Sequence, residues 1–209
     1  LVPAARNKPE NIAKRFEYAG IFTQIPQDSL IFLDECGISC SIRKSHGRSL
    51  RGTPPRKTVR SIRSKKILIS AAITKNRVYF FEYSLTACNG EKYGIFLSNL
   101  MAKLAEDRIY NRCFVLDNVP FHKMTTIREL IECQGHRVLF LPPYSPQLNP
   151  IEEVFSKWKG LIKDANSDSH EQLLAAMRTS VSQITGSDCE GYFSNMMRYI
   201  VKAFNRDEF

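Results

Sequence analysis

Two short stretches, SLIFLD at residues 29–34 and CFVLD at residues 113–117, share one pattern: an apolar run that ends in an aspartate. An apolar run without alternation is typical of a strand that is buried on both faces of a sheet. An ionised carboxylate next to such a run is costly unless it is solvated or paired. We therefore expect Asp34 and Asp117 to lie at the mouth of a sheet, where each strand ends.

The segments around these two strands complete an α/β pattern. ILISAAIT (67–74) and VYFFEY (78–83) flank Lys75-Asn76-Arg77 and predict an antiparallel hairpin, and RVLFL (137–141) predicts a further buried strand. Helical spacing of apolar residues predicts helices around 11–19, over 91–106, near 127–131, from Asn149 or Pro150 onward, over about 170–184 and over about 189–204. This order predicts a mixed five-stranded sheet with helices on both faces.

The composition is that of a globular chain. It has 209 residues, of which 43% are hydrophobic and 24% charged. No apolar stretch approaches the roughly 18 residues that span a bilayer, and the six cysteines form no CxxC pair, so a membrane protein, a disulfide framework and a zinc site are disfavoured.

We expect three parts along the chain. Residues 1–27 should be a lead-in linker and helix, 28–165 the main domain with an inserted loop at 41–66, and 166–209 C-terminal helices that pack on the same domain. Because the chain opens at Leu1 and not at Met, we also expect it to be a piece of a longer protein.

The positive charge is concentrated in one segment. The net charge is +9, yet twelve basic residues and no acidic one lie between Glu35 and Glu82, while the remaining chain carries 18 basic against 21 acidic residues. Glycines and prolines within 41–66 predict an extended loop, which either binds phosphates or is a solvated linker. The candidate DNA-binding residues are Arg43, Lys44, Arg48, Arg51, Arg56, Lys57, Arg60, Arg63, Lys65 and Lys66.

A third acidic residue is expected beside the two aspartates. The apolar stripe of the helix after Pro150 must face the core, and at about 100° per residue Glu152 lies about 90° from its centre and Glu153 about 170° from it. Glu152 can then border the crevice, whereas Glu153 points to water. The alternative is a capping box, with Asn149 as N-cap and Glu152 at the third helical position.

These acids together suit a divalent cation. Two carboxylates about 4 Å apart repel by roughly 4 kcal/mol at an effective dielectric of 20, and a cation removes that repulsion. Ligands that are all oxygen favour Mg²⁺ or Mn²⁺. Asn118 and His122 are candidates to support the ligands from outside. The alternatives are a solvated or helix-capping role for either aspartate, and a packed or surface position for His122.

The string LFLPPYSPQLNPIEEVFSKWK (139–159), with FLDECG (32–37) and VLDNVPFHK (115–123) upstream, resembles the catalytic domain of mariner-like transposases and their bacterial insertion-sequence relatives. Residues 118 to 151 separate Asp117 from Glu152, a spacing of the Asp-Asp-Glu superfamily. The resemblance covers about residues 10–165. It implies a ribonuclease H-like fold, with Asp34, Asp117 and Glu152 as catalytic ligands of two Mg²⁺ or Mn²⁺ ions.

The resemblance also implies a function and partners. These are metal-dependent DNA strand cleavage and strand transfer in cut-and-paste transposition, by a homodimer acting on double-stranded transposon ends and target DNA. Such an enzyme works in the nucleus of a eukaryote, or in the cytoplasm or nucleoid of a bacterium. Two alternatives stay open: a ribonuclease H-like nuclease without strand transfer, and a domesticated transposase that binds DNA or a partner without cutting. A glycosidase leaves the basic loop unexplained.

Overall fold

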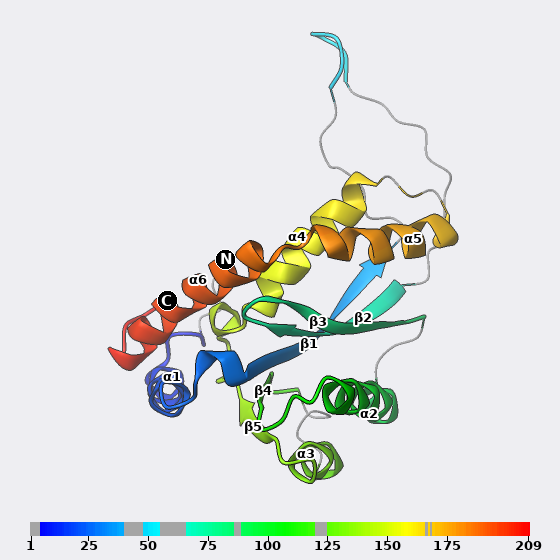
Figure 1. Cartoon of the computed structure of the whole chain (residues 1–209). Helices are drawn as coiled ribbons and strands as arrows, with labels where there is room; N and C mark the ends of the chain where they lie inside the picture. Colours follow the sequence, from blue (N-terminus) through cyan, green and yellow to red (C-terminus); the bar gives the residue numbers. More distant parts are fainter. Residues whose placement is uncertain are drawn as a thin grey trace.

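A five-stranded mixed sheet, in the order β3-β2-β1-β4-β5, forms the centre of the computed structural model (Figure 1). The structure describes residues 5–39, 48–54, 66–85, 89–119, 125–165, 167 and 169–209. β1 pairs antiparallel with β2 and parallel with β4, β2 pairs antiparallel with β3, and β4 pairs parallel with β5. The strands are β1 (Leu30–Ser39), β2 (Lys66–Thr74), β3 (Arg77–Ser84), β4 (Cys113–Leu116) and β5 (Arg137–Phe140).

Helices cover both faces of the sheet, as expected. One core contains buried residues of α1, α4, α5 and α6, and a second core, on the opposite face, is built with α2 and α3 (Figure 1). The helices are α1 (Pro9–Phe22), α2 (Gly90–Glu106), α3 (Thr125–Glu132), α4 (Ile151–Asp164), α5 (His170–Ser180) and α6 (Gly186–Phe204). Short 3-10 turns lie at Gln27–Ser29, Pro146–Leu148 and Val181–Gln183.

The first strand is longer than the sequence predicts. β1 continues past Asp34 to Ser39, because β2 pairs with it as far as Ser39 opposite Lys66. Cys36 and Ile38 bury their side chains in the core on the α4 side. Asp34 therefore lies within a strand and not at its end, whereas Asp117 directly follows β4 as expected.

Most predicted helices are present with shifted ends. α1 is longer than 11–19 at both ends, and the helix predicted over 170–184 ends as α5 at Ser180 and continues as a 3-10 turn. α6 begins at Gly186 and not at 189, because Thr185 and Asp188 form a capping box there.

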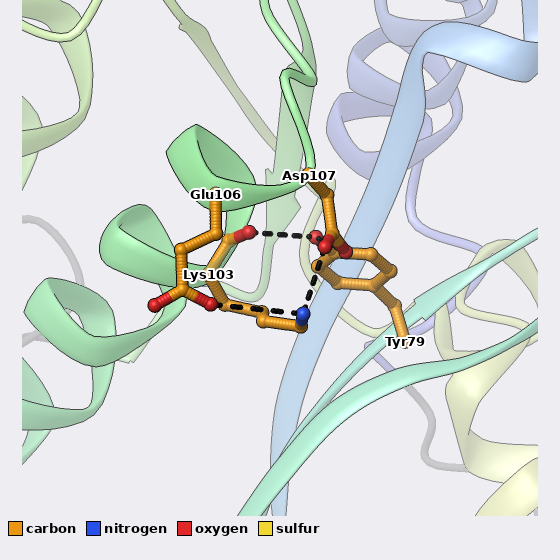
Figure 2. A network of polar contacts seen from close by, with 4 residues as sticks. All are labelled: Tyr79, Lys103, Glu106 and Asp107. Carbon is orange, nitrogen blue, oxygen red and sulfur yellow. Dashed lines mark hydrogen bonds and ion pairs between the residues drawn. The ribbon is translucent and has the colours of Figure 1, made fainter.

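A polar network joins β3 to the end of α2. The Tyr79 hydroxyl donates to Asp107 Oδ2 at 2.8 Å, and Lys103 Nζ donates to Oδ1 of the same carboxylate at 2.7 Å (Figure 2). Glu106 lies 3.7 Å from the same ammonium group. Burial and the bond to Asp107 raise the pKa of Tyr79, so its hydroxyl stays protonated. Within the described ranges, no helix is long and apolar enough to cross a membrane.

Candidate active site

Asp34 and Asp117 point to the face of the sheet that α4 covers. Phe32 and Cys36 of β1 enter the core on the α4 side, so strand alternation places Asp34, which lies between them, on that face. Val115 of β4 enters the same core, and Asp117 follows two residues later. Since Phe32 pairs with Val115 in parallel register, two further residues along each strand bring Asp34 beside Asp117.

A cleft of 390 Å³ brings the three predicted acids together. It is lined by Asp34, Asp117 and Glu152. The rest of its wall consists of Asn118, Val119, Asn149 and the proline-rich segment 141–146, which connects β5 to the turn before α4.

Glu152 lies in the first turn of α4 and is exposed, so its side chain borders the cleft. The alternative reading of a capping box is wrong. The N-cap of α4 is Pro150, and no side chain caps the helix. Asn149 instead donates from Nδ2 to Asp34 Oδ2 at 2.8 Å.

Glu153 does not point to water as expected. It is half-buried, and its Oε1 accepts a hydrogen bond of 2.7 Å from Asn195 of α6. α6 lies against α4, and the core between them covers this side of the helix. The two adjacent glutamates therefore differ: Glu152 faces the cleft, and Glu153 joins two helices.

Asp34 carries the strongest electrostatic conflict in the cleft. Burial is the main cause that raises its pKa to about 7, and the nearby carboxylates of Glu152 and Asp117 raise it further. The Glu35 backbone N–H, which donates to Asp34 Oδ1 at 2.7 Å, acts in the opposite direction. Asp34 is half-buried, and a cation bound among the three acids would offset the repulsion between their charges.

The donor set of the cleft fits a hard divalent cation. Its carboxylate and amide side chains offer oxygen ligands, and Asn149 Oδ1 is buried with no hydrogen-bond partner among the described residues. Among the residues that the structure describes, no three His, Cys, Asp or Glu side chains lie close enough together to hold a metal ion in their present conformations. Binding a cation therefore requires these side chains to converge, and the exposed Glu152 has the most room to do so.

The segment after β4 is held by local bonds. Asp117 Oδ1 accepts from the Val119 backbone N–H at 3.1 Å, and Asn118 Nδ2 donates to the Leu141 carbonyl. Asn118 thus ties the end of β4 to the segment after β5 while it lines the cleft. His122 lies outside the described residues.

The basic segment is described only in part. Arg48, Arg51 and Lys66 are exposed, and none of the three lines the cleft. The other candidates lie outside the described residues: Arg43, Lys44, Arg56, Lys57, Arg60, Arg63 and Lys65.

Two further residues of the cleft have features that the sequence does not predict. Asn149 resembles a helix cap in sequence, and only the fold shows that its amide reaches Asp34. Tyr144 has a positive φ of 54° and is 53% exposed at the cleft wall. A positive φ is unusual for a bulky residue and is often found at functional sites. In the sequence, the prolines around Tyr144 are the feature that indicates an unusual backbone there.

Solved structures similar to this chain are transposases. The Mos1 transposase paired-end complex with left transposon end matches with a TM-score of 0.83 and 20% identity, over 100% of this chain and 65% of that chain. The catalytic domain of Mos1 mariner transposase matches with a TM-score of 0.75 and 16% identity, over 97% and 96%. The same domain with Raltegravir and Mg gives a TM-score of 0.75. No curated protein matches this chain significantly.

The fold likeness confirms the predicted ribonuclease H-like fold, and this chain spans about two thirds of the transposase in the paired-end complex. A family model described as DDE superfamily endonuclease matches residues 29–174, which include both aspartates and Glu152. The chain therefore belongs to the family of DDE superfamily endonucleases.

Proposed function

We propose that this chain is the catalytic domain of a DNA transposase that cuts and joins DNA strands with Mg²⁺ or Mn²⁺. One observation carries the proposal: Asp34, Asp117 and Glu152 line one cleft of a DDE-family domain, although they come from distant parts of the sequence. Similar solved structures include a Mos1 strand transfer complex and a Mos1 paired-end complex with Mn, which supports the reaction and the cofactor.

Each acid has a role that follows from its position. Asp34 in β1 and Asp117 directly after the neighbouring β4 would hold two ions between them, and Glu152 would add a ligand to one. Divalent cations held there would supply the charge that activates an attacking hydroxyl and neutralises the leaving oxygen of an in-line displacement. The backbone of Asp34 lies in the sheet, that of Asp117 directly follows it, and α4 carries Glu152 at the side of the cleft. The protein thus contributes mainly position and charge.

The proposal extends to the partners. The substrates are double-stranded transposon ends and target DNA, and the active form is a homodimer. In a eukaryotic host the protein works in the nucleus, and in a bacterium at the nucleoid. The structure of the Mos1 paired-end complex with left transposon end supports the choice of DNA as substrate.

The adjacent glutamates provide a matched test. We expect Asp117→Asn and Glu152→Gln to abolish Mg²⁺-dependent nicking of a supercoiled plasmid. Glu153→Gln should leave it unchanged, because Glu153 bonds Asn195 away from the cleft. Nicking that persists in Asp117→Asn, or equal losses in both glutamate variants, would contradict the assignment.

A second substrate separates strand transfer from simple hydrolysis. A short duplex with a free 3′-hydroxyl is incubated with the plasmid, and joined products are measured. A transposase forms a covalent duplex–plasmid product, whereas a nuclease without strand transfer yields only nicked plasmid. A domesticated protein binds the duplex and yields neither product.

A further inference from the structure

Asn149 connects two of the three acids of the cleft. Its side-chain Nδ2 donates to Asp34 Oδ2 at 2.8 Å, and its backbone carbonyl accepts from the Glu152 N–H at 3.2 Å. The side-chain bond joins residues 115 positions apart in the sequence. One residue thus ties Asp34 in the central strand to the start of the helix that carries Glu152.

The Asn149 side chain does this instead of capping its own helix. An asparagine at the N-cap of a helix usually accepts a hydrogen bond from a first-turn N–H, which stabilises the helix. Asn89 does so in this chain, where its Oδ1 accepts from the Lys92 N–H at 3.0 Å. α4 has Pro150 as its N-cap and no side-chain cap, and the side chain of the preceding Asn149 bonds Asp34 instead of a first-turn N–H.

The amide orientation has a cost. Asn149 is 3% exposed, and its Oδ1 has no hydrogen-bond partner among the described residues. A buried acceptor without a partner destabilises the native state, because no hydrogen bond compensates for its removal from water. Reversing the amide would place Oδ1 against the Asp34 carboxylate, so the acid determines the orientation. We therefore infer that the orientation of the Asn149 amide is set by its bond to the Asp34 carboxylate.

Both carboxylate oxygens of Asp34 accept a hydrogen bond. Oδ1 accepts from the Glu35 backbone N–H at 2.7 Å, and Oδ2 accepts from Asn149. Each oxygen keeps a further lone pair, because a carboxylate oxygen accepts more than one bond. The carboxylate plane is therefore fixed while its capacity to bind a cation remains.

We propose that Asn149 is a positioning residue, which holds the Asp34 carboxylate at a fixed orientation and separation from Glu152 so that the acids converge on one divalent cation. The inference rests on the proposed function, since it assumes that the cleft binds a cation. Groups that orient metal ligands from outside typically change metal affinity by about 10–100-fold when removed.

The test measures Mn²⁺ binding to the whole chain by isothermal titration calorimetry, without a DNA reaction. We expect Asn149→Ala to weaken Mn²⁺ binding at the cleft by about tenfold or more. The Mn²⁺ affinity of Asn149→Ser, which keeps a hydroxyl donor, should lie between that of Asn149→Ala and that of the wild type. Asn149→Ser also serves as the test if the alanine variant does not fold. Duplex binding in the presence of chelator should not change in either variant.

Asn195→Ala is the matched control. It removes an asparagine–glutamate hydrogen bond of 2.7 Å at the neighbouring Glu153, outside the cleft, and should leave the Mn²⁺ affinity unchanged. If Asp117→Asn abolishes Mn²⁺ binding while Asn149→Ala binds as the wild type does, the positioning role is overturned and the proposed function stands. If the wild type binds no Mn²⁺ that depends on Asp117, both are overturned.

Discussion

Asp34 lies where its charge opposes stability, and in the proposed function the same carboxylate would bind the metal. It lies within β1, where its carboxylate is largely removed from water, and two other acids line the same cleft. Burial and these neighbours raise its pKa to about 7. In the protein without metal, an ionised Asp34 therefore destabilises the native state, and a bound cation would reverse that effect.

This conflict predicts a pH dependence of stability. Because the native pKa of Asp34 is about 7 and the reference value is 3.8, the native state binds the proton more tightly than the unfolded state does. The contribution of Asp34 is fully present below about pH 4 and is lost as the pH rises through 7, by up to about 4 kcal/mol.

Thermal unfolding with chelator at pH 5 and pH 8 checks this for the wild type and Asp34→Asn. Asp34→Asn should gain stability relative to the wild type as the pH rises. Other titrating groups, such as His136, contribute equally to the pH dependence of both proteins. Parallel pH profiles would show that Asp34 does not titrate as its environment indicates.

The candidate acids could be predicted from the sequence, but the residue that joins them could not. Asp34 and Asp117 end apolar runs, and helical spacing places Glu152 beside the crevice, so the local pattern makes all three acids candidates. It does not predict that β1 continues past Asp34. Asn149 before Pro150 has the same local sequence whether its amide caps α4 or reaches another strand. That choice depends on the position of β1, which a local pattern does not contain.

The sequence predicts which segments form strands and which form helices. The residues at which these elements end depend on contacts with other segments. β1 extends past Asp34 because β2 lies opposite, and α6 starts early because Thr185 and Asp188 cap it reciprocally. Asp188 also forms an ion pair with Lys157 of α4. The start of α6 is therefore attached to the helix that carries Glu152.

The cap of α6 predicts a stability effect with a matched control. Thr185→Ala removes the acceptor of the Asp188 N–H bond and should cost about 1 kcal/mol, or about 2–4 °C in melting temperature. Thr179→Ala removes an exposed threonine of α5 that caps no helix, and should change stability by less than about 0.5 kcal/mol. Equal effects of the two substitutions would contradict the role of the cap.

The whole molecule separates its charges along the sequence. One segment between Glu35 and Glu82 holds twelve basic residues, and the rest of the chain is slightly acidic. The acidic cleft alone would repel a DNA phosphate. Cations bound by the three acids would reverse the charge at the cleft, and the basic segment would attract the duplex around it.

Duplex binding should then depend steeply on salt. Replacing Arg56, Lys57, Arg60 and Arg63 by Ala should reduce the log–log slope by about 3–4, because each lost phosphate contact removes about 0.9. A second variant replaces four exposed basic residues of α1, α3 and α6 or their ends, and it should change the slope little: Lys8, Lys14, Arg128 and Lys202. An equal loss of slope in both variants would indicate a general effect of net charge.

Diffraction from crystals soaked in Mn²⁺, recorded at a wavelength where manganese scatters anomalously, tests the central claim most directly. We predict Mn²⁺ in the cleft between Asp34 and Asp117, with Glu152 as a ligand of one ion. A cleft without anomalous density at saturating Mn²⁺, or Mn²⁺ bound only elsewhere on the molecule, would contradict the assignment of these three acids to the metal.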